Sequence, residues 1–303
     1  MTKIIFSRKG FDSSAGGIPS SKRGEHLISF PIPYEKNTLT TYNHVGLGKH
    51  IKDLSNNKIK PTDTCHFDPN LDYGEFGQVG AAQTHLKNNN VDVGDLFLFW
   101  GWFRETLTVN KRTIFSKEDP GHYRLFGWMQ IGKIIHLGKD PSWYLKEEPH
   151  SMSHPHTIGS WGNNNTLYLA SDKLDTFDLK DYYGFGKFKA SDRTNLSINP
   201  SVKKSKWICP KWLNPNHGGC GMTYHKDIKR WNDNTVDIVG RGQEFIAEPK
   251  KLNDCKVWLK DIFKDANTID EVEYFKKLKE ELNEEVLRRA LLHKDQWTRD
   301  TIH

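Results

Sequence analysis

The stretch Val93-Gly-Asp-Leu-Phe-Leu-Phe-Trp-Gly-Trp-Phe-Arg104 decides the fold of this 303-residue chain. A turn leads into an unbroken apolar run, which is typical of a buried strand. A second run over residues 123–135, Tyr-Arg-Leu-Phe-Gly-Trp-Met-Gln-Ile-Gly-Lys-Ile-Ile, contains Gly127 and Gly132, which indicate bends or close backbone approach. Two strands of this length and bulk predict a barrel or a strongly bent sheet.

Shorter elements are expected on both sides of this pair. Apolar runs bounded by polar or proline-containing segments predict further strands, and mixed stretches of helical spacing predict short helices. The strands are expected at 3–6, 27–32 and 166–171, and the helices at 45–54 and 78–86.

The C-terminal region has the clearest helix signal. Thr268 and Glu271 have the spacing of a capping box, and apolar residues recur at helical intervals from there to about Leu292. We therefore expect a single α+β domain over 1–265 and a helix over 266–303 packed on it.

Composition and charge bound the class of protein. The chain has a net charge of +6 and ten tryptophans, so we expect an aromatic-rich core and cleft and, if the charge is clustered, a phosphate-bearing partner. Four scattered cysteines without a C-x-x-C pair argue against a disulfide framework. Since no apolar run is long enough to span a membrane and the N-terminus does not have the pattern of a signal peptide, a cytoplasmic location is expected.

The loop Ser7–Ser20 follows the first predicted strand and carries many reactive groups, among them Arg8, Lys9, Asp12 and Ser13. Polar loops at strand ends often hold chemistry on a rigid support. The cations, carboxylate and hydroxyls suit a nucleotide, with Asp12 as acid, base or nucleophile. The loop matches neither the P-loop nor the G-x-G-x-x-G pattern, and the alternative interpretation is an ordinary glycine-rich turn.

Two short histidine motifs are further candidates, His66-Phe-Asp68 and His154-Pro-His156. A carboxylate and histidines can act as general acid and base. They can also hold Fe(II) in a facial triad, with His154 or His156 as the third ligand. Asp68-Pro-Asn equally favours a simple Asx turn, so the residues alone leave these alternatives open.

The segment Trp100-Gly-Trp-Phe-Arg104 offers aromatic rings beside an arginine. Such a group can form a cage in which an extruded base stacks, with Arg104 on a phosphate or a base edge. The alternative is that these rings belong to the core. Basic residues interleaved with tryptophans between 203 and 231 suit either a nucleic-acid backbone or a solvated face.

Several of these motifs together resemble a known family. The segments at 7–20, 64–71, 94–104, 154–156, 196–201 and 242–245 resemble the nucleotide modification-associated domain family of the third type. The resemblance extends over about residues 5–250. It implies an enzyme that modifies, or acts on, DNA bases, including in phage–host conflict.

The two long predicted strands also resemble the strand pair of PUA-like barrels, whose relatives bind extruded modified bases. The expected fold is therefore α+β. It has a central bent sheet or a PUA-like β-barrel core, peripheral helices and a long C-terminal amphipathic helix.

These expectations combine into one functional hypothesis. The chain would be a DNA glycosylase that flips a modified base out of the duplex and hydrolyses its N-glycosidic bond with the help of a carboxylate. The alternatives are a base-modifying transferase using the same pocket, a non-catalytic reader of modified bases and an Fe(II) oxygenase. The partner would be double-stranded DNA carrying modified bases, with no membrane and no obligate protein partner. Neither a metal nor an organic cofactor is required.

The hypothesis assigns roles to particular residues. Asp12 is the first choice for the catalytic carboxylate and Asp68 the second, with Lys9 and His66 as further catalytic candidates. The other candidates would hold phosphates, wall the pocket or contact the base. They are Arg8, Phe11, Ser13, Tyr73, Trp100, Trp102, Arg104, His154, His156, Gln243 and Glu244.

Overall fold

The computed structural model describes residues 2–11, 15–148, 154–198, 200–201, 203–240 and 242–273. The chain divides into two compact units, Met1–Ala266 and Asn267–His303.

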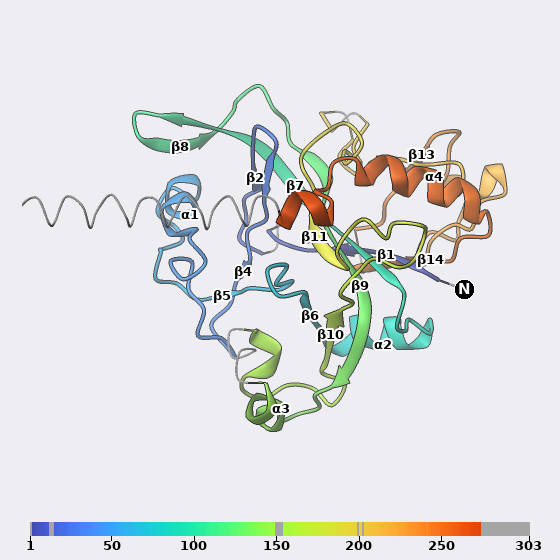
Figure 1. The fold of residues 1–303 in the computed structure, drawn as a ribbon. Helices are drawn as coiled ribbons and strands as arrows, with labels where there is room; N and C mark the ends of the chain where they lie inside the picture. The colour runs from blue at the N-terminus through green and yellow to red at the C-terminus, as the bar shows by residue number, and fades with distance from the viewer. Residues whose placement is uncertain are drawn as a thin grey trace, which may run out of the picture. The chain divides into compact units, whose positions relative to one another are not determined.

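A mixed sheet forms the centre of the first unit, and ten strands of the described residues belong to it (Figure 1). Six of them follow one path. In order across the sheet they are β14 (Glu244–Ala247), β1 (Ile4–Arg8), β7 (Leu96–Val109), β9 (His122–His136), β10 (Thr166–Ala170) and β6 (Glu75–Gln78).

Four shorter strands extend this sheet. β7 pairs in parallel with β1 and β2, and the other pairs in the sheet are antiparallel. The four are β2 (Ser20–Arg23), β3 (His26–Ile28), β8 (Arg112–Phe115) and β11 (Phe185–Lys187). Two small two-stranded sheets join β4 (Ile32–Pro33) to β5 (Cys65–His66) and β12 (Lys206–Ile208) to β13 (Thr235–Asp237).

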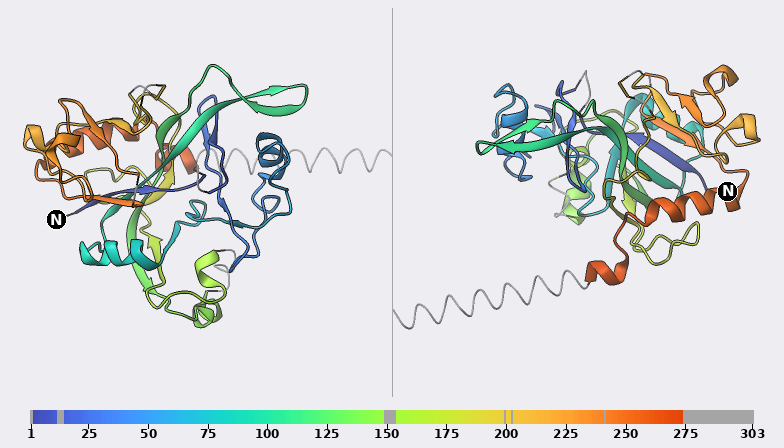
Figure 2. Two further views of the ribbon diagram at one scale, coloured as in Figure 1. Left: turned by 180° about the vertical axis from the view of Figure 1, so that it is seen from behind. Right: turned by 90° about the horizontal axis from the view of Figure 1, so that it is seen from above.

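The sheet curls strongly into a half-barrel, as the long strands β7 and β9 show (Figure 2). Their register shifts between Phe99 and Trp100, and the β9–β10 register shifts at Gly132. A Cβ on Gly127 would lie 2.8 Å from the carbonyl oxygen of Gly186. Bulges and close backbone approach both increase curvature, so the predicted bent sheet is confirmed.

The first part of β7, residues 96–101, is buried on both faces, which explains its unbroken apolar sequence. Leu96, Leu98 and Trp100 point into one core cluster, and Phe97 and Phe99 point into another. The first cluster also contains the buried face of α4 (Leu252–Phe263), a helix that the sequence analysis did not predict.

The other helices are short. The predicted helices at 45–54 and 78–86 correspond to α1 (Gly48–Leu54) and α2 (Gly80–Asn88). The strand predicted at 27–32 is instead divided between β3 and β4, which belong to different sheets. The remaining described helices are α3 (Ser142–Glu147) and three 3-10 turns, η2 (Pro155–Thr157), η3 (Pro215–His217) and η4 (Ile228–Arg230).

The second unit begins with the predicted capping box. The backbone N–H of Thr268 donates to Glu271 Oε2 at 2.7 Å, and that of Glu271 donates to Thr268 Oγ1 at 3.3 Å. From residue 274 the predicted long helix lies outside the described residues, so it stays a prediction. In the described part of the chain, no helix has the length and apolar character needed to cross a membrane.

Candidate functional site

A cavity of about 740 Å³ opens where the ends of several strands converge. β1 ends at Arg8, β5 ends at His66, and β14 begins at Glu244. Gln78 at the end of β6 donates from Nε2 to Glu244 Oε1 at 2.7 Å. Since β6 and β14 are the two ends of the six-strand path, this bond joins the ends of the curled sheet at the cavity wall.

Seven of the residues singled out in the sequence line this cavity. They come from parts of the chain as far apart as β1 and β14, and they include both basic and acidic side chains. They are Arg8, Lys9, His66, Asp68, His156, Gln243 and Glu244.

Asp68 is the centre of a histidine cluster. Its Oδ1 lies 3.2 Å from His154 Nε2 and accepts a hydrogen bond from the backbone N–H of Gly77 at 2.9 Å. Its Oδ2 lies 3.6 Å from His66 Nε2. His154 is fully buried and its Nδ1 accepts from the backbone N–H of His156, so its Nε2 carries the proton that it donates to Asp68.

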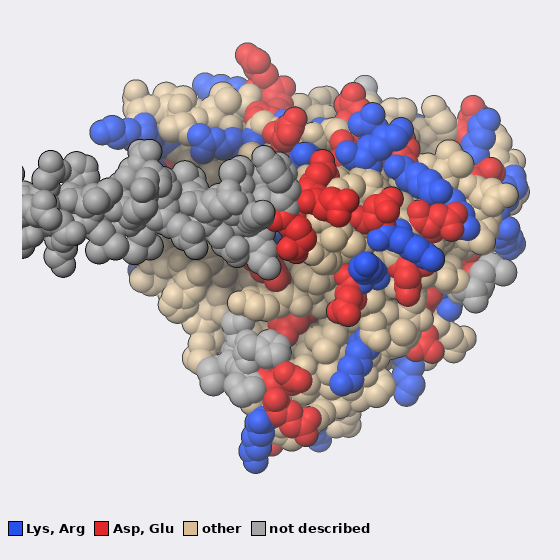
Figure 3. All heavy atoms as spheres, in the orientation of Figure 1, with Lys and Arg blue, Asp and Glu red and all other residues tan. Residues whose placement is uncertain are grey.

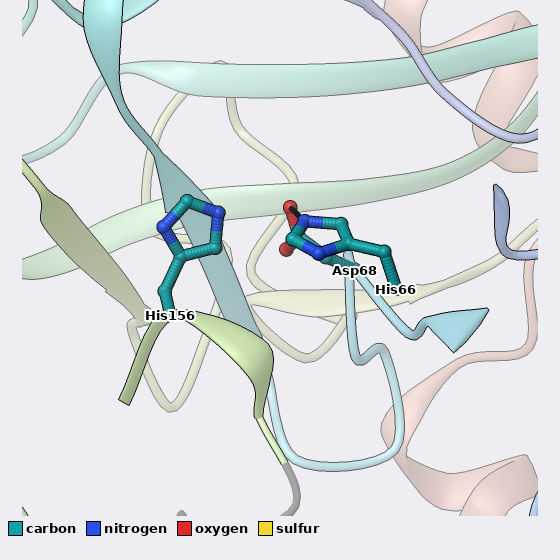
Figure 4. A group of neighbouring side chains, drawn as sticks. All are labelled: His66, Asp68 and His156. Atoms are coloured by element: carbon teal, nitrogen blue, oxygen red, sulfur yellow. Dashed lines mark ion pairs between the residues drawn. The ribbon is translucent and has the colours of Figure 1, made fainter. Parts of the chain in front are cut away.

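His156 presents an unprotonated nitrogen to the same place. Its Nδ1 faces Asn165 Oδ1 at 2.7 Å, and the Asn165 amide is oriented by donating to the His156 carbonyl at 2.9 Å. The ring nitrogen Nδ1 therefore carries the proton, and Nε2 is free to accept a proton or bind a ligand. Figure 4 shows the His156 ring turned towards Asp68 and His66.

Burial and close packing set the charges of the cluster. Burial alone would raise the pKa of the Asp68 carboxyl, but the hydrogen bond from His154 and the neighbouring His66 ring hold that pKa well below its usual range. Burial lowers the pKa of His156 to about 3. At neutral pH the cluster thus combines a carboxylate anion with a neutral imidazole at His156.

Gly77 makes this packing possible. A Cβ at this position would lie 2.2 Å from His156 Cδ2 and 2.9 Å from His154 Cε1. Because real Cβ contacts are never that short, both histidine rings occupy space that only a glycine leaves. The same residue supplies the backbone N–H to Asp68.

A second polar group lies across the cavity. Lys9 Nζ lies 3.1 Å from Glu244 Oε1 and 4.3 Å from the centre of the Phe76 ring. The other carboxylate oxygen, Glu244 Oε2, is buried and has no hydrogen-bond partner among the described residues. A buried acceptor of this kind can receive an N–H of a bound molecule, because leaving it unpaired costs about 1–3 kcal/mol.

Aromatic rings form the wall beside the cluster. The Trp161 ring stacks on His156 with ring centroids 4.3 Å apart, and the Tyr34 ring meets His66 edge-on at 5.1 Å. Tyr224 and His85 stack at 4.5 Å and also line the cavity. Flat rings beside polar groups suit a planar ligand such as a base.

The other predicted aromatic residues do not line this cavity. Phe11 packs on Phe30 in one core cluster, and Trp100 is buried in another because it lies in the middle of β7 rather than at its end. Trp102 packs edge-on against Tyr123, and Tyr73 is 65% exposed outside the cavity. Phe11, Tyr73, Trp100 and Trp102 therefore do not form the wall of this cavity, whose aromatic rings include those of Tyr34, Trp161 and Tyr224.

The remaining candidates have other surroundings. Arg104 donates to the Ser116 carbonyl at 2.6 Å and does not line the cavity. His154 lies behind Asp68 instead of in the cavity wall. Asp12, the first choice for the catalytic carboxylate, and Ser13 lie outside the described residues.

Sequence reasoning missed several residues of the site. Gln78 was interpreted only as the start of a helix, and Tyr34 and Trp161 stood in segments without a motif. Asn165 belongs to a run of three asparagines that the sequence shows close to the His154-Pro-His156 motif, but the sequence did not indicate its role.

The distribution of charged side chains on the surface affects how a nucleic acid could bind. Among the described residues on the face seen in Figure 3, basic and acidic side chains are interspersed. A nucleic-acid backbone is attracted by clustered Lys and Arg, so this face does not have the charge pattern of a backbone-binding surface.

Comparison with known proteins gives one match. A family described as nucleotide modification associated domain 3 matches residues 3–248, a range that includes every residue lining the cavity. Searches of the curated proteins and of the solved structures find no match.

Proposed function

Because the chain belongs to the nucleotide modification associated domain 3 family, we propose that its cavity takes up a single modified base from DNA and that the protein is a glycosylase. The family description associates the chain with nucleotide modification. The reaction proposed here is hydrolysis of the N-glycosidic bond after base flipping. The extruded base would lie in the cavity where the strand ends of the curled sheet converge.

The observation that carries the proposal is the buried carboxylate of Asp68 at the wall of a cavity with aromatic rings. Cavities of about 300–1,000 Å³ hold small ligands, and the volume of about 740 Å³ is sufficient for one nucleotide. Flipping a base out of a duplex costs a few kcal/mol, which stacking on Trp161 or Tyr34 would offset.

The proposed reaction consumes one water. Its oxygen attacks C1′ of the sugar, and the bond from C1′ to the base nitrogen breaks with its electron pair remaining on the base. The proton of the water passes to the histidine–aspartate cluster and from there to the leaving base. Asp68 stabilises the positive charge that develops on the sugar, as carboxylates do in glycoside hydrolysis.

The other side of the cavity would bind the flanking phosphates and select the base. Lys9 and Arg8 line it and offer cations to the phosphates that flank the flipped nucleotide. Glu244 Oε2 would accept an N–H of the base, and Gln243 stands beside it. A base without an N–H at that position would leave the carboxylate oxygen unpaired and would be disfavoured.

The test is incubation of the protein with DNA duplexes that carry different modified bases, followed by mass spectrometry of the released small molecules. We expect free base and an abasic site, and loss of release by about 100-fold or more in Asp68→Asn. Asp72→Asn is the matched control, because Asp72 follows in the same loop, is 59% exposed and does not line the cavity.

Three results would replace the proposal. A gain of mass on the DNA would indicate a transferase, and tight binding without any change in the DNA would indicate a reader of modified bases. Equal activity of Asp68→Asn and Asp72→Asn would remove Asp68 from the reaction.

A further inference from the structure

We propose that His66, Asp68 and His156 bind one divalent transition-metal ion in the wall of the cavity. Each residue offers one ligand atom, and these atoms all lie within 4.8 Å of one another (Figure 4). The existence of the site rests on this geometry alone, whereas the task given to the ion rests on the proposed function.

The set of ligands is one that such ions prefer. Two imidazole nitrogens and one carboxylate oxygen on the same side of an ion leave its other positions open for water or substrate. The residues come from two separate segments, β5 with the loop after it and η2, so the fold and not a local turn brings them together.

The ligand atoms of His156 and Asp68 are oriented by partners that are not themselves among the three proposed ligands. Asn165 Oδ1 accepts a hydrogen bond from the Nδ1–H of His156, which leaves Nε2 unprotonated. His154 and the Gly77 N–H both occupy Oδ1 of Asp68, which leaves Oδ2 on the side of His66. Partners of this kind fix the tautomer and direction of metal ligands in known sites.

His66 is the residue whose hydrogen-bonding capacity the described protein leaves unused. Its Nδ1 is buried without a partner in the part of the chain that the structure describes, and its Nε2 lies 3.6 Å from Asp68 Oδ2, too far for a good hydrogen bond. Coordination of an ion by this ring would satisfy one nitrogen that the protein itself does not satisfy.

The three ligand atoms need to move only slightly to surround one ion. Ligand atoms about 2.1 Å from an ion lie about 3 to 3.4 Å from one another, so the widest pair would approach by about 1–2 Å. Rotation of the His66 side chain accounts for such a movement without a change in the backbone. An ion bound here would lower the pKa of a bound water to about 7 and supply the attacking hydroxide of the proposed hydrolysis.

The experiment uses the full chain, freed of metal with a chelator and then titrated with Co²⁺ and with Zn²⁺. We expect one ion per chain, a visible Co²⁺ absorption spectrum of nitrogen and oxygen coordination, and displacement of Co²⁺ by Zn²⁺. Asn165→Ala should weaken binding by about 10- to 100-fold, and His66→Gln by more than that, because it removes a ligand and not merely its partner.

His85→Gln is the matched control. His85 lines the same cavity but its Nε2 lies 3.0 Å from Thr223 Oγ1, and it does not belong to the cluster. The proposal is overturned by a wild-type chain that shows no saturable Co²⁺ binding, or by a His66→Gln variant that folds and binds Co²⁺ as the wild type does. Circular dichroism of each variant establishes that it is folded.

The metal site and the glycosylase fail in different ways. Release of base at an undiminished rate after complete removal of metal would show that the ion takes no part in the reaction. The proposed function would then stand without it. A chain that binds Co²⁺ at these residues but releases no base would keep the site and remove the proposed reaction.

Discussion

Asp68 Oδ1 has two hydrogen-bond partners and Oδ2 faces His66, and the residue types alone could predict only part of this arrangement. The motif His66-Phe-Asp68 pointed to acid–base or metal chemistry, and both residues line the cavity. The second motif could not show which histidine faces the ligand. The turn η2 decides this, because His154 caps it and is directed behind Asp68 while His156 reaches the cavity.

The first prediction concerns Gly77→Ala. The new Cβ would lie 2.2 Å from the His156 ring, so the ring must move away from Asp68 and Asn165. We expect the free energy of unfolding to fall by about 1–3 kcal/mol, as for other overpacked sites. We also expect the affinity for Co²⁺ or the rate of base release to fall at least 10-fold. Urea denaturation and Co²⁺ titration measure the two effects.

Gly240→Ala is the control for this substitution. No heavy atom lies within 4 Å of a Cβ built on Gly240, so this variant should behave as the wild type does. If Gly77→Ala retained wild-type stability and Co²⁺ affinity, the packing of the histidine rings on Gly77 would not constrain the site.

At the scale of elements, strands were easier to predict than their ends and partners. The apolar run at 93–104 predicted β7, but β7 continues to Val109, so Trp100 is an internal strand residue in the core. The helix α4 was missed although its buried residues Cys255, Leu259 and Ile262 have helical spacing. It has no side-chain cap at Lys251, whereas the capping box at Thr268 drew attention to the following segment.

The second prediction is that α4 contributes to stability through one face. Leu259 is fully buried in the same core cluster as Trp100, so Leu259→Ala should lower the free energy of unfolding by about 2–5 kcal/mol. Val257 in the same helix is 69% exposed, so Val257→Ala should change it by less than about 0.5 kcal/mol. Urea denaturation of both variants checks the prediction, and equal effects would mean that α4 does not pack as described.

At the scale of the molecule, the cavity depends on contacts that no local pattern contains. Gln78 and Glu244 are 166 residues apart in sequence, yet their side chains are hydrogen-bonded. The sequence predicted a bent sheet from two strands and their glycines. It could not predict that the curl brings β6 and β14 together, because that depends on the order of all six strands in the path.

The third prediction concerns pH and the whole folded unit. Burial lowers the pKa of five histidines, His50, His85, His122, His156 and His225. In the unfolded chain a histidine titrates near about 6.5. Below that pH the unfolded chain therefore binds more protons than the folded chain, and the free energy of unfolding falls as the pH falls. The stability from these groups is fully present above about pH 6.5 and is lost progressively below it.

The effect is large enough to measure. A histidine that stays neutral in the folded state contributes a loss of up to about 1.4 kcal/mol for each pH unit below 6.5. Between pH 7.5 and pH 5.0 we expect a loss of at least about 2 kcal/mol and a fall in Tm of roughly 4–8 °C, measured by thermal denaturation with a chelator present.

His225, which accepts the Val239 N–H at Nε2, is the best single test. His225→Gln should be less stable at pH 7.5 but lose less stability on acidification, because one proton-binding difference is gone. A Tm that stays constant or rises from pH 7.5 to pH 5.0 would mean that these histidines are not held neutral by burial.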